Sequence, residues 1–177
     1  MDQPFGTSYL EAEGESKMIK ENSLVYSFKE HGLYYENNPY KETQKIVTFA
    51  IDTLQLDFDY NTGELKFITG FLPLVKSKKI SINVPNYIEE NYCISLENID
   101  YFPGMAYEYF DFFTDSENYF LRDDLPMTYY DEATKLILIG TKDSIDKCIK
   151  INKNIYCGID ETGNLKYLLI CSNCIII

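Results

Sequence analysis

The sequence predicts a mainly β protein, with an antiparallel, hairpin-rich sheet that forms either a sandwich or a partial barrel. From Ser23 onward, short runs rich in Val, Ile, Phe and Tyr are separated by turn residues every eight to twelve positions or so. Period-two alternation and a recurring turn motif support the same fold class. Helical periodicity is weaker and predicts one to three short helices, so an α+β fold is the alternative.

The most regular strand signal lies between Lys45 and Asp59. Apolar and polar residues alternate in its second half: Leu54, Gln55, Leu56, Asp57, Phe58 and Asp59. This alternation predicts one buried face and one solvated face. Residues 60–63 predict a tight turn in which Gly63 supplies a positive φ, followed by a return strand over 65–71. Another strand is expected over 79–84, with Ile80, Ile82 and Val84 on one face.

The turn motif recurs near the end of the chain. Residues 160–167 match residues 60–67 through a Thr-Gly-x-Leu-Lys-aromatic core, and a looser version spans 131–136. Two explanations stay open: common turn chemistry, or a duplicated β unit covering about 46–99 and 127–170. The domain prediction is therefore a mobile N-terminal lead-in over 1–22 and a single β-rich domain over 23–177, with two related units as an option.

Helical features occur in four segments: 8–22, 87–93, 104–114 and 141–148. In the third segment, Met105, Tyr109 and Phe112 recur at helical spacing after a Pro-Gly start. In the fourth, acidic residues lie near the start and Lys147 near the end, which matches the preference of the helix dipole.

Composition excludes several classes of function. The chain carries 28 acidic and 16 basic residues, for a net charge of −12. Direct nucleic-acid binding needs clustered Lys and Arg, yet the densest basic run lies within 76–79 and Arg122 is the single arginine. The N-terminus lacks the features of a signal peptide, and no apolar run is long enough to span a bilayer. We therefore expect a cytoplasmic protein with reduced, buried cysteines and no membrane partner.

Neither a catalytic residue nor a cofactor or metal site is predicted. Cys171 and Cys174 form a lone Cys-x-x-Cys without the further ligands of a zinc site. His31 is expected in a turn, because no nucleophile signature accompanies it. Asp57 and Asp59 share a strand face and could hold a metal or perform acid–base work, but a solvated strand face gives the same pattern.

The most distinctive segment runs from Glu97 to Asp124, where aromatic residues are interspersed with carboxylates. Tyrosine supplies interface area at low entropic cost, and surrounding carboxylates steer a basic protein partner. The predicted partner-binding residues are Tyr101, Tyr107, Glu108, Tyr109, Asp111, Asp115, Glu117, Asp123 and Asp124. The alternative is an aromatic core helix with an acidic outer face.

In general character, over 23–177 and in this acidic segment, the chain resembles the immunity proteins of bacterial toxin–immunity pairs, including those of contact-dependent growth inhibition. The resemblance implies a protein without enzymatic activity that binds a cognate basic toxin, often a nuclease domain, and occludes its active site. A DNA-mimic inhibitor of a DNA-binding protein is one alternative function. A ligand-binding domain or hydrolase is another, and the sequence predicts no oligomeric state.

Overall fold

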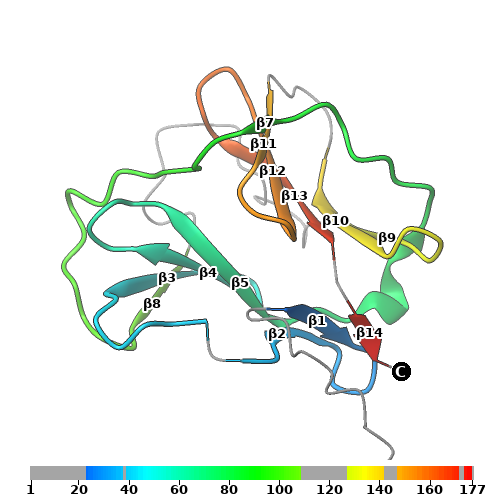
Figure 1. Cartoon of the computed structure of the whole chain (residues 1–177), viewed down its shortest axis with the longest axis horizontal. Coiled ribbons are helices and arrows are strands. Elements are labelled where there is room, and N and C mark those ends of the chain that lie inside the picture. Colours follow the sequence, from blue (N-terminus) through cyan, green and yellow to red (C-terminus); the bar gives the residue numbers. More distant parts are fainter. Residues whose placement is uncertain (1–22, 38, 109–126, 142–146, 172–173, 177) are drawn as a thin grey trace, which may run out of the picture.

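The computed structural model describes residues 23–37, 39–108, 127–141, 147–171 and 174–176, which form two β-sheets (Figure 1). The first sheet has the order β14-β1-β2-β5-β4-β3-β8. Its strands are β1 (Leu24–Ser27), β2 (Gly32–Tyr35), β3 (Ile46–Ile51), β4 (Leu54–Asp59), β5 (Leu65–Phe71), β8 (Ala106–Glu108) and β14 (Cys174–Ile176). The prediction of a mainly β fold is confirmed.

The second sheet has the order β6-β9-β10-β13-β12-β11-β7. Its strands are β6 (Lys78–Lys79), β7 (Ile88–Glu89), β9 (Thr128–Asp131), β10 (Leu136–Gly140), β11 (Lys147–Lys150), β12 (Ile155–Ile159) and β13 (Leu165–Cys171). A single 3-10 turn, η1 (Leu74–Lys76), is the one helical element among the described residues.

One hydrophobic core lies between the two sheets. In β3 every second residue is buried, as period-two alternation requires, and the inward side chains meet those of the other sheet. The shared core includes Phe49, Leu56, Phe58 and Ile68 from the first sheet and Ile137, Ile139, Cys157 and Leu168 from the second. Because each strand belongs to one sheet only, the architecture is that of two packed sheets rather than a partial barrel.

The two sheets repeat one strand order. Strands β1-β2-β5-β4-β3 and β9-β10-β13-β12-β11 are both fully antiparallel, over residues 24–71 and 128–171. Each five-stranded unit gains a parallel strand at both edges: β14 and β8 in the first sheet, β6 and β7 in the second. The prediction of an antiparallel sheet did not include these parallel edge strands, which make both sheets mixed.

The looser version of the sequence repeat, at residues 131–136, has a local explanation. The Asp59 carboxylate accepts the N–H groups of residues 61 and 62, and the Asp131 carboxylate accepts those of residues 133 and 134. In both turns the residue four positions after the aspartate, Gly63 or Lys135, has a positive φ. The β9–β10 hairpin corresponds in topology to β1–β2 and not to β4–β5, so common turn chemistry accounts for this recurrence. Duplication of a β unit stays a hypothesis.

Two expected helices are wrong where the structure describes them. Within 87–93, Ile88 and Glu89 form β7 and pair with Ile149 and Lys150. Within 104–114, residues 106–108 form β8 along β3, because Tyr107 packs its ring on Phe49. The lead-in over 1–22 and the helix expected over 8–22 lie outside the described residues. Most of the helix expected over 141–148 also lies outside them, and its last two residues, Lys147 and Cys148, belong to β11.

The strand expected over 79–84 is also wrong. Lys78 and Lys79 pair with β9, the N–H of Ile80 donates to the Tyr130 carbonyl at 3.3 Å, and beyond it the N–H of Ile82 donates to the Asp131 carboxylate at 2.8 Å. This bond replaces a strand ladder, so Ile82 is buried while Ile80 and Val84 are exposed. The segment is part of a long connection that leaves β5, passes over the second sheet and returns to β8 at the edge of the first (green in Figure 1).

Candidate functional site

The two described tyrosines of the predicted partner-binding segment are both partly buried. The Tyr107 ring packs on Phe49, and its hydroxyl donates to the carbonyl of Asp100 at 2.8 Å. The Tyr101 ring packs on Tyr60, with the Lys45 ammonium 5.4 Å from its centroid. Glu108 is the last residue of β8. The other predicted partner-binding residues lie outside the described part of the chain: Tyr109, Asp111, Asp115, Glu117, Asp123 and Asp124.

A tight turn between these two tyrosines exposes apolar side chains that are not among the predicted partner-binding residues. The N–H of Met105 donates to the carbonyl of Phe102, and Gly104 has a φ of 78°. Pro followed by a Gly of positive φ is the signature of a type II turn, and this signal could have corrected the helix prediction. Phe102 is 53% exposed and Met105 is 48% exposed. The turn thus presents two apolar side chains at the edge of the first sheet.

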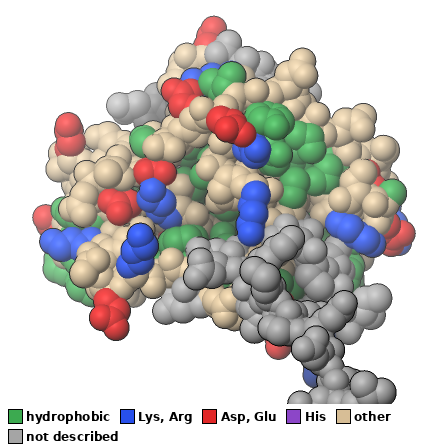
Figure 2. Space-filling view, in the orientation of Figure 1, with side chains coloured by type: hydrophobic (Ala, Val, Ile, Leu, Met, Phe, Trp, Pro, Cys, Tyr) green, Lys and Arg blue, Asp and Glu red, His purple; other side chains and the backbone are tan. Residues whose placement is uncertain are grey.

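The two carboxylates next to this turn belong to the described carboxylates that form no ion pair with a described residue, as do the exposed Glu30, Glu36, Glu42, Asp52 and Glu161. Figure 2 shows acidic and basic side chains interspersed over one face of the molecule. Five lysines form ion pairs with nearby carboxylates, namely Lys66–Glu64, Lys79–Glu132, Lys147–Glu90, Lys150–Glu89 and Lys166–Asp160. Glu97 and Asp100 are exposed and form no such pair with any described residue. Their charge is therefore available to a basic partner.

Asp57 lies in a buried polar cluster, not on the solvated face that the alternation predicted. Its carboxylate is 3% exposed and accepts hydrogen bonds from the hydroxyls of Tyr40 and Thr48. Burial raises the pKa of Asp57, against the opposing effect of these two hydrogen bonds. Phe67 packs edge-on against Tyr40 and covers this part of the sheet. With its oxygens taken by hydroxyls, Asp57 supports the sheet structurally.

His31 lies in the β1–β2 turn, as expected, with a φ of 53°. Its ring packs edge-on against Phe71, and its carbonyl accepts the N–H of Leu72 at 2.6 Å. Among the cysteines, Cys148 and Cys157 are buried as expected, whereas Cys93 is exposed. In the described part of the chain, no three His, Cys, Asp or Glu side chains are grouped so that they could hold a metal ion.

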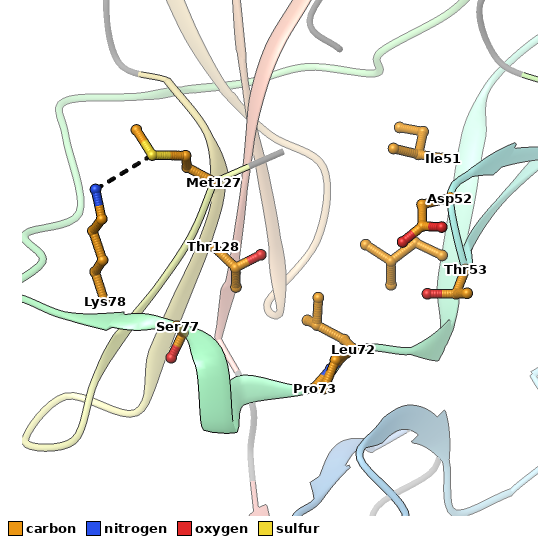
Figure 3. A pocket seen from close by; sticks show the side chains of 10 residues that line it. Ile51, Asp52, Thr53, Leu72, Pro73, Ser77, Lys78, Met127 and Thr128 are labelled. Atoms are coloured by element: carbon orange, nitrogen blue, oxygen red, sulfur yellow. Dashed lines mark hydrogen bonds between the residues drawn. The ribbon is translucent and has the colours of Figure 1, made fainter. Parts of the chain in front are cut away.

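A cavity of about 250 Å³ opens between the ends of the two sheets (Figure 3). Three separate segments line it: the β3–β4 turn, the residues that follow β5, and the start of β9. The lining residues are Ile51, Asp52, Thr53, Leu54, Leu72, Pro73, Ser77, Lys78, Met127 and Thr128. Asp52 and Thr128 point toward the space between them, and Leu72 forms its floor. Asp57, Asp59 and His31 do not line this cavity.

The polar groups around the cavity differ in their contacts. Lys78 and Met127 both line the cavity, and the Lys78 ammonium lies 3.5 Å from the Met127 sulfur, across the view from Asp52 (Figure 3). The Thr53 hydroxyl donates to the carbonyl of Phe71 at 2.7 Å. Asp52 is exposed, and its carboxylate forms no ion pair with any cation of the described residues. Sequence patterns could not reveal this cavity, because only the fold brings its three segments together.

No known family model matches this chain, and no curated protein matches it significantly. Over the residues that the structure covers, no helix has the length and apolar character needed to cross a membrane. The geometry of the chain itself is therefore the basis for a functional proposal.

Proposed function

We propose that the protein binds a basic protein partner along the β8 edge of the first sheet and, as an immunity protein would, neutralises a cognate toxin. The observation that carries the proposal is the exposed turn formed by residues 102–105. It presents Phe102 and Met105 beside the exposed carboxylates of Glu97 and Asp100. Exposed apolar anchors beside unpaired charges are what a specific, charge-steered interface needs.

The edge position of β8 supports the same surface. Among the described strands, β8 pairs with β3 alone, so its other side is an edge of the described sheet, and we propose that the partner approaches there. The predicted partner-binding residues Tyr109, Asp111, Asp115, Glu117, Asp123 and Asp124 follow β8 directly in sequence. The proposed interface therefore begins at the turn, follows β8 and continues into the most acidic part of the chain.

Inhibition would follow from charge and shape. Carboxylates would occupy the toxin site that binds substrate phosphates, while Phe102 and Met105 anchor the complex and fix its register. The net charge of −12 speeds association with a cationic partner. Tyr101 and Tyr107 would act mainly by holding the turn and β8 in place, since both rings pack against residues of the first sheet.

The test is affinity purification of the tagged protein from its native host at low and at moderate salt. We expect one stoichiometric basic protein, and we expect the double charge reversal Asp111→Lys and Asp115→Lys to remove it. Expression of that protein alone should arrest growth, and co-expression of the wild-type chain should restore it. Recovery of several DNA-binding enzymes in place of one partner would favour a DNA mimic. No partner at either salt would contradict the proposal.

A further inference from the structure

The cavity between the sheets combines apolar walls with two charged lining residues, Asp52 and, across the view from it in Figure 3, Lys78. Ile51, Leu54 and Leu72 supply the apolar surface, and Asp52 lies at the rim. Its volume of about 250 Å³ is smaller than that of most small-molecule sites, which hold roughly 300–1,000 Å³. The cavity therefore suits a single long side chain better than a cofactor or a drug-sized ligand.

The chemistry of the cavity selects among side chains. A lysine has an aliphatic stem that packs along apolar surface and an ammonium that stays at the polar rim. The carboxylate of Asp52 forms no ion pair with a cation of the described residues, so it can accept an incoming ammonium. An aliphatic residue would fill the walls but would gain no contact with the exposed Asp52 carboxylate.

The cavity also lies at one end of the proposed interface. Because β8 is parallel to β3, with Glu108 opposite Ala50, β8 ends on the side of the sheet where Asp52 lies. Phe102 and Met105 precede the other end of β8. Met127, which is 51% exposed, lines the cavity from the second sheet. A partner bound along β8 could thus extend one side chain into the cavity from the same interface.

We propose that this cavity receives a lysine side chain of the basic partner, with the stem against Leu54 and Leu72 and the ammonium on Asp52. The inference rests on the proposed function for the identity of the partner, but the lysine site can be tested without it. Asp52 has a φ of 53°, a conformation that Asn adopts readily, so Asp52→Asn removes the charge with little change to the turn.

The probe is Nα-acetyl-lysine N-methylamide, titrated while the methyl resonances of Leu54, Leu72 and Thr128 are followed by NMR. We expect saturable shifts with the lysine probe and weaker binding of the norleucine analogue, which lacks the ammonium. Asp52→Asn should weaken lysine binding about three- to fivefold, as expected for one exposed ion pair, and Asp100→Asn should leave it unchanged. Absence of saturable shifts, or equal binding by Asp52→Asn, would overturn the inference.

Co-purification and the lysine titration together distinguish failure of the lysine site from failure of the proposed function. If a basic protein co-purifies and its affinity is unaffected by Asp52→Asn, the lysine site is wrong and the proposed function stands. If the lysine probe binds as expected and no basic partner co-purifies, the cavity is a lysine site and the proposed function is wrong.

Discussion

Gly63 and Gly163 occupy corresponding hairpins of the two sheets with similar backbone conformations but different surroundings. Their φ angles are 69° and 87°. A Cβ atom at Gly63 would lie 2.0 Å from the carbonyl oxygen of Ile94, whereas one at Gly163 would meet nothing within 4 Å. The difference arises because the long connection to β8 returns across the first hairpin, where the N–H of Ile94 donates to the carbonyl of Gly63.

The two glycines therefore give a matched pair of substitutions. Gly163→Ala should cost about 1 kcal/mol, from the positive φ alone. Gly63→Ala should cost roughly 3 kcal/mol or more, because the backbone of Ile94 must also move. Urea unfolding of both variants measures the difference. Equal losses would contradict the described contact between the hairpin and the connection.

Tyr26 fixes the start of the same connection beside the cavity. Its buried hydroxyl donates to the carbonyl of Leu72 at 2.8 Å and accepts the N–H of Leu74 at 3.1 Å. Tyr26→Phe leaves both backbone groups without this partner and should cost about 1–3 kcal/mol of unfolding free energy. Tyr129→Phe is the control, since its exposed hydroxyl donates, within the described residues, a weak hydrogen bond to the Met127 sulfur at 3.7 Å, and its loss should change stability by less than about 0.5 kcal/mol. Similar losses in the two variants would argue against a structural role for the Tyr26 hydroxyl.

Asp57 should make stability depend on pH. Since burial raises its pKa in the folded state, its contribution is fully present below the unfolded-state pKa of about 4 and is lost as pH rises through the folded-state pKa. Relative to wild type, Asp57→Asn should therefore gain stability as pH rises from 4 toward neutrality. Each unit between the two pKa values is worth about 1.4 kcal/mol.

Thr48→Val extends this test. The Thr48 hydroxyl donates to the Asp57 carboxylate at 2.6 Å and lowers its pKa, so its removal should make the pH dependence steeper than in wild type. Urea unfolding between pH 4 and pH 8 measures the free energy of unfolding against pH for wild type, Asp57→Asn and Thr48→Val. Parallel profiles for wild type and Asp57→Asn would show that this carboxylate does not titrate differently in the folded state.

Local sequence chemistry was enough to predict the β4–β5 hairpin. The alternation over 54–59 and the turn ending at Gly63 correspond to β4, its turn and β5. The alternation hid a second turn, however: Asp52 adopts a positive φ without the glycine that usually marks one, so β3 and β4 looked like one continuous run. The burial of Asp57 could not be predicted from the alternation, because the Tyr40 hydroxyl that donates to its carboxylate comes from a segment outside the strands.

Features that depend on distant pairing could not be predicted. The parallel edge strands are only two or three residues long in β6, β7 and β8, so they carry no periodic signal of their own. The Pro103-Gly104 pair gave a local signal for a turn, but the strand that follows it forms only through its pairing with β3. The cavity likewise depends on segments that meet only in the folded chain.

Binding of a basic protein at the β8 edge can be tested by comparing what co-purifies with three tagged chains. Wild type and Val84→Ser, which alters an exposed apolar residue away from the turn, should each recover one basic protein in equal amount. The double variant Phe102→Ser and Met105→Ser should recover about tenfold less or none, as expected when apolar anchors are removed. Equal recovery by the double variant, or no basic protein with the wild-type chain, would contradict the claim.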